Sequence, residues 1–161
     1  MRIIRFEDET GQVRLGEEEG DGRARILAGD LLGDLELTGE SVTVGKLLAP
    51  LVPTNILCIG LNYREHAVES GAKIPEYPVL FMKPTSALTN PGDPIRLPAC
   101  QHDSETDYEC ELAVVIGRAI RDIPEAEALE AVLGYTCAHD VSARHWQMNA
   151  GAGQWIRGKG F

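Results

Sequence analysis

The residues DYECELAVVIG, at positions 107–117, carry the most informative pattern in this chain. Positions 112–116 form a short apolar run followed by glycine, which predicts a buried β-strand. Successive side chains of a strand point to opposite faces, so Glu109 and Glu111 project from one face and Cys110 from the other. Two carboxylates so close raise each other's pKa unless a cation neutralises them. The pair is therefore either a solvated strand face or part of a cation site.

A third carboxylate, Asp140, lies in another strand-like run at residues 134–142. Three carboxylates with no thiolate among them suit Mg²⁺, Mn²⁺ or Ca²⁺ rather than zinc. Glu109, Glu111 and Asp140 are accordingly the candidate metal ligands. His139 is expected to be structural, because a strand would point it away from the face that carries Asp140.

A histidine and a glutamate, His66 and Glu69, stand three residues apart in a tract of helical composition at residues 62–71. Residues at i and i+3 share one face of a helix. A carboxylate bonded to one ring nitrogen fixes the tautomer of the imidazole and leaves the other nitrogen as a base for water. The two residues are therefore either a water-activating dyad or a surface helix pair.

Cationic and amide side chains follow the third carboxylate. Arg144 and Gln147 lie four and seven residues after Asp140. A short helix beginning after Asp140 would put both on one face, where they could hold a substrate carboxylate. Lys159 is a further cation that we expect near the acidic cluster.

The composition limits the classes of function. The chain has 161 residues, 43% hydrophobic and 25% charged, and this profile indicates a globular protein. Its net charge of −10 repels phosphate backbones and anionic membranes, so we expect no nucleic-acid partner and no membrane partner. An anionic small substrate would need a cation at its site. The four cysteines form no C-x-x-C pair and the N-terminus has no apolar leader, which favours a cytoplasmic location with free thiols.

Other elements follow from apolar runs and turn residues. Residues 1–53 are predicted to form a small β-rich module that ends at two prolines. Strands are expected at residues 3–6, 12–15, 25–27, 56–61 and 79–82. A helix is expected at residues 124–133, with Asp122 as its cap and Gly134 at its end.

Five motifs occur in consistent order along the chain: IGLNYREH (59–66), FMKP (81–84), DYECELAVVIG (107–117), HDVSAR (139–144), and a last one that runs from QW to GKGF (154–161). Together they resemble the fumarylacetoacetate hydrolase family. The resemblance runs from about residue 56 to the last residue. It is closest to the branch that contains fumarylacetoacetate hydrolase domain-containing protein 2 and bacterial 2-keto acid hydrolases and isomerases.

The resemblance implies roles for the candidate residues. It implies Mg²⁺, or else Mn²⁺ or Ca²⁺, on Glu109, Glu111 and Asp140. It also implies a water-activating dyad of His66 and Glu69 on a lid segment, and substrate contact by Lys159, Arg144 and Gln147. The implied fold is α+β and mainly β, a mixed β-sandwich roll after a small β-rich N-terminal domain, assembled as a homodimer.

The resemblance also bears on domain organisation. Family members continue past the position of Phe161. We therefore expect residues 1–53 to form the N-terminal domain and residues 54–161 to form the N-terminal part of a catalytic domain that is incomplete in this chain.

The function expected is cleavage of a carbon–carbon bond in a 2,4-dioxo acid such as an acylpyruvate. His66 and Glu69 would activate water, Lys159 would offset developing negative charge, and a metal ion would stabilise the enolate. The same enolate chemistry would serve decarboxylation of oxaloacetate or isomerisation of a 2-hydroxy-diene-dioate. An alternative of another class is a truncated module that binds a metal or a partner without turnover, and a third is a solvated acidic face.

Overall fold

The computed structural model describes residues 1–97, 99, 105–150 and 153–160, so Cys100, one of the four cysteines expected to be free thiols, lies outside the described residues. The described residues are mostly in β-strands and fall into two compact units. The first unit comprises Met1–Val52, Thr89–Pro94 and Cys110–His139, and the second comprises Pro53–Leu88, Ile95–Glu109 and Asp140–Phe161. Within the described ranges, every helix is too short or too polar to cross a membrane.

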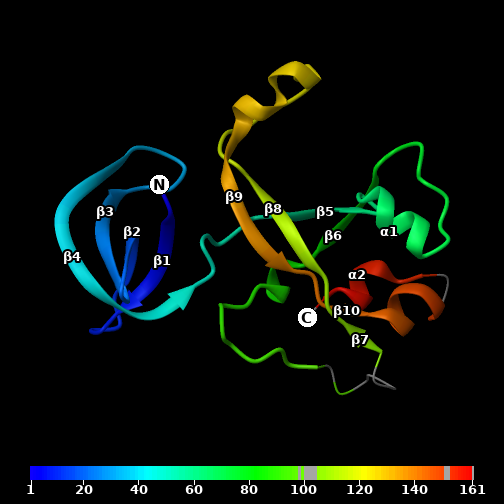
Figure 1. Ribbon diagram of the computed structural model, residues 1–161, viewed down its shortest axis with the longest axis horizontal. Coiled ribbons are helices and arrows are strands. Elements are labelled where there is room, and N and C mark those ends of the chain that lie inside the picture. Colours follow the sequence, from blue (N-terminus) through cyan, green and yellow to red (C-terminus); the bar gives the residue numbers. More distant parts are fainter. Residues whose placement is uncertain (98, 100–104, 151–152, 161) are drawn as a thin grey trace. The chain divides into compact units, whose positions relative to one another are not determined.

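Four antiparallel strands of the first unit close into a barrel (Figure 1). They are β1 (Ile3–Asp8), β2 (Val13–Gly20), β3 (Arg23–Gly29) and β4 (Leu35–Leu48). The first three confirm the strands expected from apolar runs. The pattern missed β4 because this strand changes partners along its length, pairing first with β3 and then with β1, so its burial follows no single alternation.

The barrel core comes from alternate residues of its strands. Ile4 and Phe6 of β1 pack with Ala24 and Ile26 of β3. Gly16 of β2 faces this core, and a Cβ atom added to it would lie 3.1 Å from the Phe6 ring. A side chain at that position would therefore push two strands apart.

A buried carboxylate, Asp8, organises the turn between β1 and β2. Its Oδ1 accepts hydrogen bonds from the amide nitrogen and hydroxyl of Thr10 (2.9 and 2.6 Å) and from the amide nitrogen of Gln12 (3.0 Å). Its Oδ2 accepts one from Arg14 Nε at 3.0 Å. These bonds, the Thr10 hydroxyl foremost, outweigh the effect of burial and lower the pKa of Asp8 to about 2.

We expect Asp8→Asn to lower the midpoint of thermal unfolding at pH 7 by roughly 2–8 °C. A carboxyl whose pKa is lower in the folded state stabilises that state above its ordinary pKa, and the contribution is lost as the pH falls through the folded value. The gap between the two proteins should therefore narrow as the pH falls from 3.8 toward about 2. Thermal unfolding followed by circular dichroism at pH 7 and at pH 3 measures this difference in midpoint. Glu9→Gln, at an exposed neighbour, should leave the midpoint unchanged, and an equal gap at both pH values would contradict the assignment.

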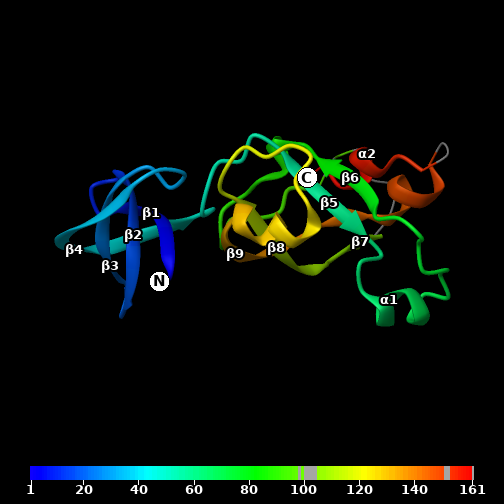
Figure 2. The same ribbon diagram turned by 90° about the horizontal axis from the view of Figure 1, so that it is seen from above.

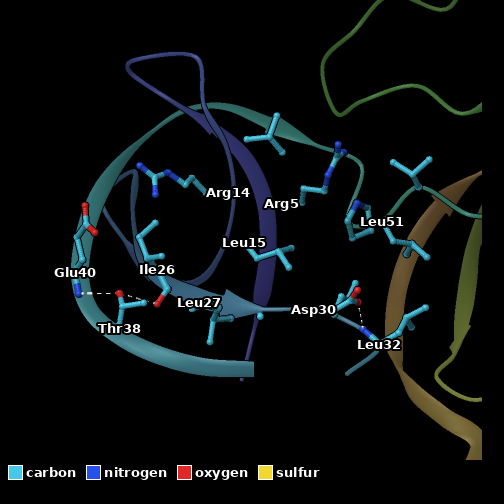
Figure 3. Close-up of a pocket in the computed structure, with 16 residues that line it drawn as sticks. Arg5, Arg14, Leu15, Ile26, Leu27, Asp30, Leu32, Thr38, Glu40 and Leu51 are labelled. Carbon is cyan, nitrogen blue, oxygen red and sulfur yellow. Dashed lines mark hydrogen bonds between the residues drawn. The ribbon is translucent and has the colours of Figure 1, made fainter. Parts of the chain in front are cut away.

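A cavity of about 620 Å³ lies in the barrel region (Figure 3). Its lining combines apolar side chains such as Leu15 and Leu27 with the charged side chains of Arg5, Arg14 and Glu40. None of the predicted site residues lines it.

The first unit also contains a two-stranded ribbon of β8 (Cys110–Ile116) and β9 (Val132–His139). It confirms the strand predicted at residues 112–116, but the prediction that this strand is buried is wrong for one face. Leu112 is 61% exposed and Tyr135 is 60% exposed. A two-stranded ribbon buries a face only where another element packs on it. The exposed apolar residues of this face are Leu112, Val114, Ile116, Leu133 and Tyr135.

The structure describes His139 and three of the four cysteines. His139 is exposed and lies directly opposite Cys110 in the β8–β9 ladder. Cys58, Cys110 and Cys137 form no disulfide within the described residues.

The helix predicted at residues 124–133 is wrong in type and length. The chain forms a 3₁₀ helix at Glu125–Ala131 and enters β9 at Val132. Asp122 does not cap it, since the residue before the helix is Pro124 in an extended conformation. Pairing with β8 recruits the last apolar residues of the predicted helix into a strand, so long-range pairing overrides the local periodicity.

The second unit carries the elements that hold the remaining site residues (Figure 2). β5 (Ile56–Gly60) pairs with β6 (Val79–Lys83), and the short helix α1 (Arg64–Glu69) connects them, within the tract predicted to be helical. β7 (Thr106–Asp107) pairs with β10 (Ser142–Ala143). The remaining elements are a 3₁₀ turn at Thr85–Ala87, a π-helical turn at His145–Asn149 and α2 (Trp155–Gly158).

Candidate functional site

The candidate site is built where residues 106–109 run antiparallel to residues 140–143. Ser142 lies opposite Asp107 in the β7–β10 pair. The amide nitrogen of Asp140 donates a hydrogen bond of 3.0 Å to the carbonyl oxygen of Glu109. Backbone pairing therefore brings acidic residues that lie far apart in the sequence into one place.

Three carboxylates meet at this point. One carboxylate oxygen from each of Glu109, Glu111 and Asp140 lies within 4.8 Å of the others. Asp140 is 3% exposed, and the two glutamates are half-buried. The structure thus brings together the three residues predicted as metal ligands, and their metal binding stays a prediction.

Two buried lysines neutralise Asp140. The Nζ atom of Lys83, at the end of β6, lies 2.6 Å from Oδ1, and the Nζ atom of Lys159, just after α2, lies 2.6 Å from Oδ2. The two lysines are 8% and 2% exposed. Burial by itself raises the pKa of Asp140, but the hydrogen bonds from Lys159 and Lys83 outweigh it and hold that pKa below its ordinary value. Asp140 is therefore ionised at neutral pH.

Lys159 also reaches two other groups of the site. Its Nζ donates to Glu109 Oε2 at 2.9 Å and to the hydroxyl of Ser142 at 2.7 Å. With Asp140, these acceptors account for the three N–H bonds of the ammonium group. Lys159 thus bridges two of the three clustered carboxylates.

Arg144 holds the outer side of the cluster. Its Nη2 lies 2.6 Å from Glu109 Oε1 and 2.7 Å from Asp107 Oδ2, and its Nη1 donates to Gln147 Oε1 at 2.9 Å. The hydrogen bond from Arg144 lowers the pKa of Asp107. Burial alone lowers the pKa of Arg144, but the hydrogen bonds to Asp107 and Glu109 raise it above its ordinary value. The predicted neighbours Arg144 and Gln147 are therefore in direct contact.

Close packing positions Lys159. A Cβ atom added to Gly158 would lie 2.7 Å from the amide nitrogen of Gln147, so only glycine lets α2 approach this backbone. The ring of Trp155 packs edge-on against Phe81 of β6, with centroids 5.2 Å apart. The lysine that follows α2 is thereby held beside β6.

The predicted dyad has no such network. His66 and Glu69 lie on α1 and both are exposed, while Ala67 is the buried residue of that helix. Among the residues that the structure describes, the side chains of His66 and Glu69 form no hydrogen bond or ion pair with each other. Their catalytic role stays a prediction.

Sequence reasoning assigned no role to three residues of this network: Lys83, Asp107 and Ser142. Lys83 was visible only as a lysine that ends an apolar strand before a proline. Its buried position is the signal, because a lysine is almost never fully buried unless it is paired. The strand alternation of β6, which buries Lys83, could have indicated this.

The donor set and the charge balance fit a divalent cation. A donor set made only of carboxylate oxygens suits Mg²⁺, Mn²⁺ or Ca²⁺. Among the described residues of the site, the three clustered carboxylates and the neighbouring Asp107 stand against three cations, Lys83, Arg144 and Lys159. One divalent ion would turn this excess of negative charge into an excess of positive charge, which an anionic substrate requires.

Comparisons with known proteins bear on the family to which the chain belongs. A family model described as "Fumarylacetoacetate (FAA) hydrolase C-terminal" matches residues 55–161, and one described as "Rv2993c-like, N-terminal" matches residues 1–50. Protein Rv2993c of Mycobacterium tuberculosis is 43% identical over 168 aligned positions, which cover 99% of this chain and 62% of that protein. "Oxaloacetate tautomerase fahd2, mitochondrial" of Xenopus laevis is 47% identical over 117 positions, 72% of this chain and 36% of that protein.

Solved structures resemble the whole chain. The structure of 5-carboxymethyl-2-hydroxymuconate delta-isomerase from Mycobacterium smegmatis has a TM-score of 0.84 and 39% identity, covering 100% of this chain and 62% of its own. That of 2-hydroxyhepta-2,4-diene-1,7-dioate isomerase from Mycobacterium marinum has a TM-score of 0.82 and 38% identity, covering 100% and 61%. The chain thus spans less than two thirds of each of these proteins. The α+β, mainly β fold is that of these relatives, and the chain belongs to the fumarylacetoacetate hydrolase family.

Proposed function

We propose that this protein is an enzyme that uses a divalent metal ion, Mg²⁺ in the first place and otherwise Mn²⁺ or Ca²⁺, to act on small 2-oxo acids through an enol or enolate. The observation that carries the proposal is the cluster of Glu109, Glu111 and Asp140, whose carboxylate oxygens lie within 4.8 Å of one another. A divalent ion held by these residues would supply Lewis-acid stabilisation of negative charge on the substrate oxygens.

The reaction we favour is tautomerisation or isomerisation of an enol diacid. The names of the Xenopus tautomerase and of the two mycobacterial isomerases support this choice. Such a reaction moves a proton between carbon and oxygen, so the enzyme must hold the oxo acid and place a proton donor beside it. Lys159, which keeps three donors in a buried position, is suited to offset developing negative charge.

Arg144 and Gln147 are the proposed contacts of the substrate carboxylate. The guanidinium group of Arg144 already forms a two-pronged contact with Asp107 and Glu109, which fixes its orientation. Gln147 is buried and bonded to Arg144, so the two would act as a unit. Asp107, Glu109 and Gln147 take four of the five N–H donors of Arg144 among the described residues, so the fifth, on Nη1, could bond one oxygen of a substrate carboxylate.

Hydrolysis of a carbon–carbon bond in a 2,4-dioxo acid is the second candidate. Decarboxylation of oxaloacetate is a separate alternative on the same site, because it also passes through an enolate but needs no attacking water. The observation that favours hydrolysis is the spacing of His66 and Glu69 on α1, at i and i+3. On one face of a helix, the glutamate could orient the imidazole as a base for water. Tautomerisation needs no such water.

The test is a substrate panel with and without metal. The protein is incubated with oxaloacetate, with an acylpyruvate and with a 2-hydroxy-diene-dioate, in 5-fold excess EDTA or with added Mg²⁺, and products are followed by NMR and ultraviolet absorbance. We expect Mg²⁺-dependent conversion of the enol to the keto form. Acyl cleavage in place of this would favour the second candidate, and carboxylate loss would favour decarboxylation. Metal binding with no turnover of any acid would favour a non-catalytic module.

Three further properties are proposed on the family membership. The two family matches support a domain boundary near residue 53. A homodimer and a cytoplasmic location are expected from the family and from the cysteine pattern of the sequence. Size-exclusion chromatography with light scattering tests the dimer.

A further inference from the structure

Asp140 and Glu109 each present one oxygen to an outer cation and one to a shared cation. The outer oxygen of Asp140, Oδ1, is bonded to Lys83, and the outer oxygen of Glu109, Oε1, is bonded to Arg144. The two inner oxygens, Asp140 Oδ2 and Glu109 Oε2, share the ammonium group of Lys159 at 2.6 and 2.9 Å. Lys83 and Arg144 are therefore each bonded to one carboxylate of this pair, whereas Lys159 is bonded to both.

We infer that Lys159 and Lys83 have opposite effects on a divalent cation at this site. Lys159 is the internal counter-ion that must leave the gap between Glu109 and Asp140 when the cation binds, and Lys83 is the positioning residue that holds Asp140 ready for it. The inference rests on the proposed function, since it concerns the same carboxylates.

The argument for Lys159 is electrostatic. Its Nζ lies between two carboxylates that belong to the candidate metal-ligand set, so it supplies there the positive charge that a cation would supply. An ammonium group and a divalent ion cannot share these oxygens without strong repulsion. Ser142 offers Lys159 a third acceptor at 2.7 Å, which can retain the ammonium group after it leaves Glu109. Its freed N–H bonds could then turn to a substrate oxygen.

The argument for Lys83 is geometric. Its Nζ contacts Oδ1 of Asp140 and the carbonyl oxygen of Val141 at 3.2 Å, and neither contact involves another carboxylate of the cluster. It therefore fixes the plane of the Asp140 carboxylate while it leaves the inner oxygen to Lys159 or to a cation. Groups that orient a metal ligand in this way commonly raise metal affinity by roughly 10–100-fold.

Mn²⁺ titration without substrate tests the inference. Calorimetry, with the electron paramagnetic resonance of free Mn²⁺ as a second readout, gives the affinity of each variant. We expect Lys159→Met to bind Mn²⁺ about tenfold tighter or more, because a competing positive charge is removed. We expect Lys83→Met to bind it roughly 10–100-fold more weakly, and Lys83→Arg to restore part of the loss. Lys46→Met, which removes one charge at the ion pair with Asp93, should bind as the unaltered protein does.

The direction in which each substitution changes the Mn²⁺ affinity separates the outcomes. If both methionine variants bind Mn²⁺ more tightly, net charge alone governs affinity and the positioning role of Lys83 is refuted. Weaker binding by Lys159→Met refutes the counter-ion role. If the unaltered protein binds neither Mn²⁺ nor Mg²⁺, the proposed function itself is refuted.

A measurement on the unaltered protein covers the case in which a variant does not fold. In protein labelled with ¹³Cε- and ¹⁵Nζ-lysine, saturation with Mg²⁺ should shift the side-chain signal of Lys159 and leave that of Lys83 nearly in place. Equal shifts of both signals, or none in a protein that calorimetry shows to be saturated, would overturn the inference.

Discussion

The Asp140→Asn variant will bind no Mn²⁺ at concentrations that saturate the unaltered protein, and its turnover will fall by more than about 100-fold. Loss of a group that merely orients a metal ligand costs roughly 10–100-fold, and Asp140 is a candidate ligand itself. The asparagine retains the size of the side chain but removes the charge that Lys83 and Lys159 share. Calorimetric titration and steady-state rates with Mg²⁺ measure the two effects.

This substitution will also destabilise the fold. Breaking a buried ion pair by neutralising one partner typically costs about 3–5 kcal/mol, because the other charge stays buried without compensation. Since the pKa of Asp140 is lowered in the folded state, its stabilising effect is present above the ordinary value of 3.8 and is lost as the pH falls through the lowered value. The gap in stability between the two proteins should therefore persist from pH 7 to pH 5 in denaturant titrations.

Two companion variants make the Asp140 result interpretable. Glu109→Gln alters a half-buried ligand candidate, so it should fold more readily and still lose Mn²⁺ binding. Asp107→Asn makes the matched change at a carboxylate that contacts Arg144 but lies outside the three-carboxylate cluster, and it should keep Mn²⁺ binding. Full Mn²⁺ affinity in folded Asp140→Asn would contradict the assignment of this residue as a ligand.

Local pattern was enough to anticipate part of the site. Strand alternation acts over two residues, so the common face of Glu109 and Glu111 could be inferred from their spacing alone. The contact of Arg144 with Gln147 likewise spans only three residues. Interactions of this range depend on backbone geometry that a few neighbouring residues determine.

The remaining contacts depend on chain segments that meet only in the folded protein. Lys83 reaches Asp140 across 57 residues, and no periodicity in the sequence links them. Lys159 meets Glu109 across 50 residues because α2 packs beside β6 and the turn that contains Gln147. The same limit explains the burial errors: an apolar run predicts a strand, but whether a face is covered depends on which other elements pack on it.

The His66→Ala variant will lose turnover by about 10²–10⁴-fold while it binds Mn²⁺ as tightly as the unaltered protein, if the reaction passes through water activation. General base catalysis by a positioned side chain contributes an effect of this size. His66 is exposed on α1, so its replacement removes no buried contact and should leave the thermal midpoint unchanged. Steady-state kinetics on an acylpyruvate and on enol-oxaloacetate measure the loss of turnover, and Mn²⁺ titration measures the affinity for the metal.

Comparing the two substrates shows which of the two reactions depends on His66. A large loss for acylpyruvate cleavage with little change in tautomerisation would assign His66 to water and leave proton transfer to the buried network around Lys159. Glu69→Gln should cause a smaller loss than His66→Ala, and the double variant should lose no more than His66→Ala, because the glutamate acts only through the imidazole. His139→Ala is the matched control, since His139 is exposed on β9 opposite Cys110 and should retain full activity. Unchanged rates on every substrate in folded His66→Ala would show that the pair on α1 is a surface helix pair.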